Sequence, residues 1–278
     1  MSSGNSIGAI SPHHHRRAVP APLGECADAA IVYLKERTLN MLKNDLIQRH
    51  PLRFLNQRSD NALAAGEFGG ILARAGVGKT ALIVQLAMNA MLKGLPVLHI
   101  SLSDPVNKVT LWYQEVYRHL TQGEDPGQAR TLWEQLLPHR FIMTFKAEGF
   151  RLPVLAERLE DLREQNIFSP AVVIMDGYPF ETAHADDLTA LKAFAANNAM
   201  SVWFTVRTHR HEAPDPTGLP AQLSGHEDLF DVLVQLQPDG KAIHVDVLKG
   251  VAPAAIPTSL ILDPTTMLIV EKECPPGG

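Results

Sequence analysis

The chain has 278 residues, 45% of them hydrophobic and 20% charged, with a formal net charge of −5. A globular domain of this size and composition buries a substantial core without disulfides or a structural metal, and its mildly acidic charge gives no support for nucleic-acid binding. No apolar run approaches the roughly 20 residues of a membrane span. The N-terminus lacks a signal-peptide pattern and neither cysteine lies in a CxxC pair, which together fit the reducing cytoplasm.

The first part of the chain divides into a tail and a helical segment. Residues 1–25 are rich in Ser, Gly, Pro and Ala without apolar periodicity, so we expect a disordered tail in which the run His13-His14-His15 is solvated. Over residues 26–58, apolar residues recur at spacings of three to five, with a break at Pro51, which predicts a helical segment. We expect one core domain over residues 59–273 and a short tail at 274–278.

Within the core domain, apolar runs and amphipathic stretches alternate. The expected strands are Gly70–Ala73, Leu95–Leu102, Phe141–Phe145, Ala171–Met175 and Ser201–Val206. The expected helices between them are Thr80–Leu92, Val106–Leu120, Ala129–Leu137, Leu152–Gln165 and Asp187–Asn198. Short strands follow at Val232–Leu236, Ala242–Leu248, Ser259–Leu262 and Met267–Val270. This order predicts an α/β fold with a mostly parallel central sheet flanked by helices, and antiparallel strands added at the C-terminal end.

A glycine-rich motif stands where the first of these strands meets its helix. Residues 73–80 follow the pattern GxxxxGK[ST], with Ala73 in place of the first glycine. Glycines let the backbone curl so that its N–H groups face phosphate oxygens, and the helix N-terminus adds positive charge. Lys79 would bridge the β- and γ-phosphates and Thr80 would bind Mg²⁺. The predicted triphosphate-binding residues are Arg74, Ala75, Gly76, Val77, Gly78, Lys79, Thr80 and Ala81. A turn that only joins strand to helix is the alternative.

An acidic residue ends a later apolar strand. Residues 171–175 are uniformly apolar and Asp176 follows them directly. A carboxylate at this place would hold a water of the Mg²⁺ shell, so Thr80 and Asp176 are the predicted metal residues. The alternative is an Asp that caps a strand-to-loop turn.

From the phosphate motif onward, the chain resembles the RecA-like P-loop ATPases, in particular their DnaB-type helicase and KaiC-type clock branches. Residues 72–82 are similar to the DnaB-type loop, including its Ala-Arg opening, and residues 97–102 to that family's next strand. Residues 230–236 place an Asp before a strand, and residues 247–250 carry a lysine at a strand end, as in that family. The resemblance covers roughly residues 60–272. It implies a RecA-like core, ATP with Mg²⁺, and a homo-oligomer.

The chain departs from the family at the catalytic positions. A glutamate that polarises the attacking water is usual after the second strand, but here Ser103 takes that register and only Asp104 follows as a candidate base. After the strand 201–206, Thr205 stands near the usual sensor position, and Arg207 or Arg210 would sense a γ-phosphate or a neighbour. An exposed basic loop is the alternative for these arginines. The resemblance makes Lys249 a residue that reaches an adjacent subunit's site.

Two further features bear on ligands. His209 and His211 have the spacing of metal ligands on a strand, but without an expected carboxylate or Cys partner we do not predict a metal site there. Residues 177–187, where helicases carry basic DNA-binding loops, are acidic with two aromatic residues, which would stack on bases or a protein partner or pack within the loop.

The sequence leaves several functions open. The first is an ATPase with slow or partner-activated turnover that couples nucleotide state to oligomerisation or to a protein partner, with catalytic residues Lys79, Asp104, Asp176, Arg207 and Lys249. A scaffold that binds nucleotide without hydrolysing it is the second. Nucleic-acid remodelling rests on the family resemblance alone and is disfavoured. A small-molecule kinase would need an acceptor site and an Arg-rich lid, which are not evident.

Overall fold

The computed structural model describes residues 23–50, 63–209, 220–250 and 259–271. The histidine run, most of the two predicted tails, Arg210 and His211 lie outside these ranges. The chain forms two compact units, Met1–Thr38 and Leu39–Gly278. The described part of the first unit is the beginning of one helix, α1.

Six α-helices are described, and five of them lie in the second unit. Their bounds are α1 Leu23–Gln48, α2 Lys79–Leu92, α3 Val106–Leu120, α4 Pro126–Leu136, α5 Leu152–Glu164 and α6 Ala185–Asn197. Short 3₁₀ helices occur at Leu137–His139, Ala147–Gly149, Phe180–Thr182, Ala221–Leu223 and Glu227–Leu229.

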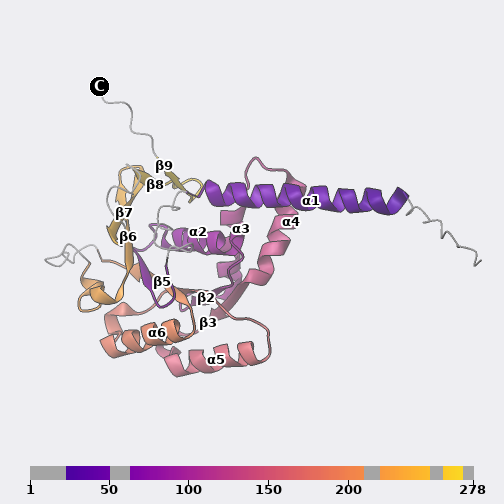
Figure 1. The fold of residues 1–278 in the computed structure, drawn as a ribbon. Helices are drawn as coiled ribbons and strands as arrows, with labels where there is room; N and C mark the ends of the chain where they lie inside the picture. The colour runs from indigo at the N-terminus through magenta and orange to yellow at the C-terminus, as the bar shows by residue number, and fades with distance from the viewer. Residues whose placement is uncertain (1–22, 51–62, 210–219, 251–258, 272–278) are drawn as a thin grey trace, which may run out of the picture. The chain divides into compact units, whose positions relative to one another are not determined.

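The described strands of the second unit form one nine-stranded sheet (Figure 1). They are β1 Phe68–Ala73, β2 Val97–Ser101, β3 Arg140–Thr144, β4 Val172–Asp176, β5 Ser201–Arg207, β6 Val232–Asp239, β7 Ala242–Lys249, β8 Leu260–Leu262 and β9 Ile269–Glu271. Their order is β3-β2-β4-β5-β1-β6-β7-β8-β9. The strands from β3 to β6 in this order are parallel, and β7, β8 and β9 are antiparallel. The predicted α/β fold with late antiparallel strands is confirmed.

Two hydrophobic layers enclose the sheet, because successive strand side chains point to opposite faces. One layer joins the sheet to α2, α3 and α4, and the other joins it to α5 and α6 (Figure 1). The strand β1 contributes to both, with Ile71 in the first layer and Leu72 in the second. The inner strands are therefore buried on both sides, which explains why apolar residues predominate in their sequences.

The helix α1 differs from its predicted range. It begins at Leu23, inside the stretch expected to be a tail, and ends at Gln48, before the predicted break at Pro51. Its second-unit part buries Leu39, Leu42 and Leu46, which recur at helical spacing, against the α2 layer. Residues 51–62 lie outside the described ranges. None of the helices in the described ranges is long and apolar enough to cross a membrane.

Candidate functional site

Four strands distant in the sequence end at one edge of the sheet. The strands β1, β2, β4 and β5 are parallel, and their last residues are Ala73, Ser101, Asp176 and Arg207. In open α/β sheets, ligands bind in the crevice outside the carboxyl ends of such strands. The phosphate motif, the predicted metal carboxylate and the two departures from the family pattern therefore share this edge.

The loop between β1 and α2 depends on two glycines in the left-handed backbone region. Gly76 has a φ of 77° and Gly78 a φ of 110°. A Cβ on Gly76 would meet nothing within 4 Å, whereas a Cβ on Gly78 would lie 2.5 Å from the Leu262 side chain of β8. Gly78 is thus required both by its backbone conformation and by its packing. The strand β8 supports the loop from the α2 side of the sheet.

The start of α2 offers its backbone N–H groups to the space beside the loop. Gly78 is the N-cap residue, and no side chain of the described residues caps this helix end. The first turn also carries no acidic residue, so the helix dipole leaves positive charge there. Ala81 is fully buried, which anchors this turn in the core. This helix end is suited to an anion such as a phosphate.

Lys79 places a cation at the same point. Its Nζ donates hydrogen bonds to the carbonyl oxygens of Ala73 and Arg74, at 2.9 and 3.0 Å. Burial lowers the pKa of the Lys79 ammonium, while the charge of Asp176 raises it and that of Arg207 lowers it. Lys79 therefore lies within electrostatic reach of both strand-end charges.

Asp176 is held by two hydroxyl groups. Thr205 Oγ1 donates to Asp176 Oδ1 at 2.6 Å, and Thr80 Oγ1 donates to Asp176 Oδ2 at 3.4 Å. Burial raises the pKa of the Asp176 carboxyl, the hydrogen bond from Thr205 lowers it, and the charge of Asp104 raises it. The two residues predicted to hold Mg²⁺, Thr80 and Asp176, are thus brought into contact. The sequence placed Thr205 near the usual sensor position but did not predict its contact with Asp176.

The segment after β2 is fixed beside Asp176 but presents a weak candidate base. Leu102 N donates to the Asp176 carbonyl at 2.9 Å, and a Cβ on Gly177 would lie 3.2 Å from Ser103 Oγ. Asp104 is bound at its backbone N–H by Ser101 Oγ and pairs through Oδ1 with Lys108 Nζ at 2.9 Å. The carboxylate at the predicted base position is therefore engaged by a lysine.

A cavity of about 430 Å³ adjoins the outer side of the loop. Its walls are Arg74, Ala75, Val77, Arg207, Thr208, His209 and Pro238. His209 Nε2 lies 3.2 Å from Glu181 Oε1, so the carboxylate neighbour not expected from the sequence exists. Both side chains are substantially exposed. Across the described residues, no group of three or more His, Cys, Asp and Glu side chains could hold a metal ion.

Lys249 is not brought to its own loop. It is the last residue of β7, and its register partner Leu233 is near the start of β6, which runs parallel to β1. Lys249 therefore lies at the amino edge of the parallel strands, opposite the loop. Its Nζ donates to the Glu227 carbonyl at 2.9 Å.

The aromatic residues after β4 pack inside the fold. The Tyr178 ring lies 5.0 Å from Phe180 and 5.6 Å from Phe204, measured between centroids. Phe180 is 5% exposed. Of the interpretations open for this segment, packing within the fold is confirmed for Phe180, and this ring is not available to stack on a nucleic-acid base.

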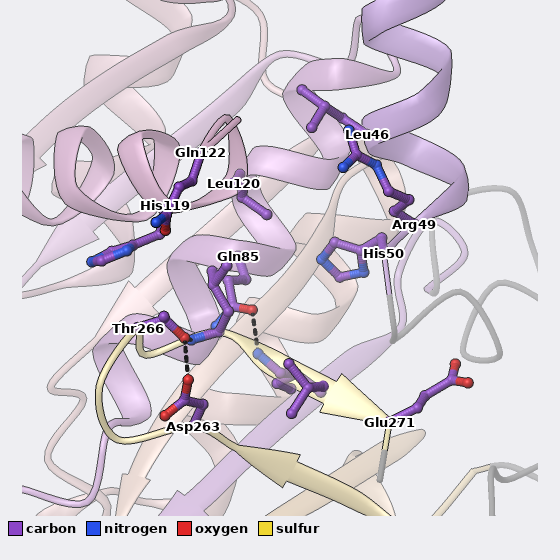
Figure 2. A pocket seen from close by; sticks show the side chains of 13 residues that line it. Leu46, Arg49, His50, Gln85, His119, Leu120, Gln122, Asp263, Thr266 and Glu271 are labelled. Atoms are coloured by element: carbon purple, nitrogen blue, oxygen red, sulfur yellow. Dashed lines mark hydrogen bonds between the residues drawn. The ribbon is translucent and has the colours of Figure 1, made fainter. Parts of the chain in front are cut away.

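A cavity of about 590 Å³ lies over the middle of α2, bounded by the end of α1, the end of α3 and the β8–β9 hairpin (Figure 2). Gln85 crosses from α2 to the hairpin and uses both ends of its amide there. Its Nε2 donates to the Met267 carbonyl at 2.7 Å, and its Oε1 accepts from Ile269 N at 2.9 Å. This side chain holds the hairpin, and with it Leu262, in place behind the loop between β1 and α2.

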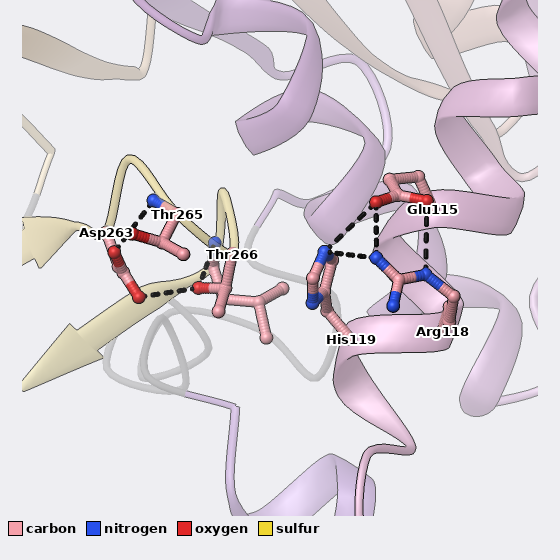
Figure 3. Close-up of polar contacts among 7 residues, drawn as sticks. Glu115, Arg118, His119, Asp263, Thr265 and Thr266 are labelled. Carbon is pink, nitrogen blue, oxygen red and sulfur yellow. Dashed lines mark hydrogen bonds and ion pairs between the residues drawn. The ribbon is translucent and has the colours of Figure 1, made fainter.

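Several charged side chains around that cavity are paired locally (Figure 3). On α3, Glu115 binds both Arg118 and His119. On the hairpin, Asp263 accepts hydrogen bonds from Thr265 N and Thr266 Oγ1, both at 2.9 Å. These pairs stabilise helix and turn, whereas the groups at the loop converge on one point. The loop is the stronger candidate site.

No family model matches the chain, and no curated protein sequence matches it. The resemblance to RecA-like ATPases thus rests on the residues of the chain itself.

Proposed function

We propose that the chain is a RecA-like ATPase that binds ATP with Mg²⁺ and turns it over slowly. One observation carries the proposal: a left-handed glycine loop, an uncapped helix start, Lys79 and the Thr80–Asp176 pair converge at the end of β1. Backbone N–H groups and a lysine suit phosphate oxygens, and a hydroxyl with a nearby carboxylate suits hydrated Mg²⁺. Mg²⁺ would supply charge neutralisation on the phosphates.

The segment after β2 supports the proposal of slow turnover. Ser103 lies against Gly177 and cannot act as a base near neutral pH, and Asp104 is paired with Lys108. Asp104 remains the nearest candidate to orient a water, since its charge acts on Asp176. The cytoplasm is the proposed compartment, and coupling to a homo-oligomer or a protein partner is the proposed output.

The second candidate is a nucleotide-dependent scaffold that binds ATP without hydrolysing it. The Asp104–Lys108 pair favours it, because the carboxylate is committed to a lysine. Phosphate release in a single turnover separates the two candidates: product formed by the purified protein supports the ATPase, and binding without product supports the scaffold.

Nucleotide selectivity tests the binding proposal. In competition against a fluorescent ATP analogue with Mg²⁺ present, ATP displaces the probe, ADP does so less well, and AMP does not, because the loop contacts the β- and γ-phosphates. The absence of saturable probe binding, or equal displacement by AMP and ATP, would overturn the proposal.

A further inference from the structure

We propose that Thr205 is a positioning residue for the metal carboxylate: its hydroxyl holds Oδ1 of Asp176, so that Oδ2 would face a hydrated Mg²⁺ held beside Thr80. This role deepens the proposed function and holds only if the loop binds nucleotide with Mg²⁺.

The first support is the location of Thr205. It lies on β5, whose residues 201–206 are all buried, and is itself 3% exposed. Its neighbours along the strand, Phe204 and Val206, are apolar. A valine would fill the same volume with similar strand preference and without a polar group to satisfy. The hydroxyl at this position therefore needs a reason other than packing.

The second support is the direction of its hydrogen bonds. Gly177 N donates to Thr205 Oγ1 at 2.9 Å, and a backbone N–H can only donate. This contact occupies an acceptor site of the hydroxyl and leaves its proton for Asp176 Oδ1 at 2.6 Å. The Gly177 amide thereby fixes Thr205 as the donor to Asp176.

The third support is that the two oxygens of the Asp176 carboxylate have different partners. With Oδ1 held by Thr205, Oδ2 is the oxygen that faces Thr80, the other predicted metal residue. The strands β4 and β5 are paired through Met175 and Phe204, so Asp176 and Thr205 are the next residues of adjacent strands. Partners that orient a metal-holding group without touching the metal commonly tune metal affinity.

The fourth support is the connection to the segment after β2. Gly177 has a φ of 85°, and a Cβ on it would lie 3.2 Å from Ser103 Oγ. The Thr205 hydroxyl thus holds both Asp176 and the turn against which Ser103 rests. One side chain of β5 sets the geometry at the ends of two neighbouring strands.

The experiment compares Thr205→Val, which removes the hydroxyl at nearly constant volume, with Thr205→Ser, which keeps it. Binding of a fluorescent ATP analogue is titrated with Mg²⁺ for each protein, and probe affinity is also measured in EDTA. For Thr205→Val, the Mg²⁺ concentration at half-saturation rises roughly tenfold, while affinity in EDTA stays within about twofold of wild type. Thr205→Ser stays close to wild type in both.

Different results would overturn the positioning role and the proposed function. A wild-type Mg²⁺ requirement in Thr205→Val, or a serine variant as impaired as the valine variant, overturns the positioning role. Wild-type protein with no saturable probe binding overturns the proposed function itself, which is a different result. If Thr205→Val does not fold, Thr205→Ala replaces it with the same expected Mg²⁺ shift, and a wild-type requirement there overturns the role equally.

Discussion

The loop between β1 and α2, which we propose binds phosphate, and the segment after β2 lie at the same edge of the sheet but are built differently. The loop is supported from the core, by the buried start of α2 and by Leu262 behind Gly78. At Asp104, by contrast, the carboxylate is held by an ion pair with Lys108, whose side chains are 22% and 58% exposed. Exposed pairs of this kind contribute about 0–1 kcal/mol. The proposed binding loop is therefore part of the packed core, whereas the proposed turnover would depend on a peripheral ion pair.

The largest effect is expected from a substitution that disturbs the packing between the loop and Leu262. Gly78→Ala places a Cβ against Leu262 in a left-handed backbone, so several N–H contacts to phosphate are lost. Each such charge-assisted bond contributes about 1.5–3 kcal/mol, so ATP affinity falls more than roughly 100-fold. Gly76→Ala, with open space around it, loses less.

The control for these variants is Gly123→Ala, which has a φ of 94° and nothing within 4 Å of the added Cβ. It carries the same backbone strain away from the loop and leaves ATP affinity unchanged. Equilibrium titration measures all three, and wild-type affinity in Gly78→Ala would contradict the packing argument.

The segment after β2 is tested by Asp104→Asn, which keeps the size of the side chain and removes its charge. If Asp104 orients the attacking water, single-turnover phosphate release falls about 100-fold, the low end of general-base effects, while ATP affinity is unchanged. Asp161→Asn on the exposed surface of α5 is the control. Unchanged phosphate release in Asp104→Asn would remove this residue from the catalytic set.

Asp176 contacts both Thr80 beside the loop and Leu102 after β2, and its contribution to stability depends on pH. Burial raises its pKa in the folded state, so its contribution to stability is largest below the usual Asp pKa of about 4 and decreases as pH rises through the folded pKa. Asp176→Asn lacks this decrease. Without Mg²⁺, its melting temperature relative to wild type therefore increases from acidic to neutral pH.

In the same variant, the Mg²⁺ concentration needed for half-maximal ATP binding rises by roughly 10- to 100-fold. A melting-temperature difference that is flat with pH would contradict the burial argument, and an unchanged Mg²⁺ dependence would remove Asp176 from the metal site.

The smallest effect is expected for Lys249→Ala. Because Lys249 lies at the opposite edge from its own loop, the ATP affinity of the isolated chain is unchanged. If it acts on a neighbouring subunit, a mixture of Lys79→Ala and Lys249→Ala chains recovers phosphate release that neither has alone. Reduced ATP affinity in dilute Lys249→Ala, or no recovery in the mixture, would contradict a role between subunits.

The sequence predicted the elements well where apolar period and length agreed. The helix α3 has its predicted bounds, and the predicted strands of the parallel sheet fall within a few residues of the observed ones. The helix α4 begins earlier than predicted because Asp125 caps it by accepting from Gln128 N. Strand order was not predicted, since it depends on packing between segments distant in the sequence.

The site was predicted in the same uneven way. Lys79, Thr80 and Asp176 stand in a local motif or at the end of an apolar run, so their positions in the sequence were enough to predict that they lie together. The sequence placed Thr205 near the usual sensor position but gave no sign of its partner Asp176, because that contact depends on the register of two strands. The pairing of Asp104 with Lys108 and the position of Lys249 likewise depend on the folded structure.

The most direct test of the account is calorimetric titration of the purified chain with ATP and Mg²⁺, compared with Lys79→Ala and with the surface control Lys146→Ala. Saturable binding of ATP with micromolar or tighter affinity is expected for wild type and for Lys146→Ala. In Lys79→Ala, loss of the charged contact to phosphate lowers ATP affinity by at least about tenfold. No binding to wild type, or equal affinity in Lys79→Ala, would contradict it.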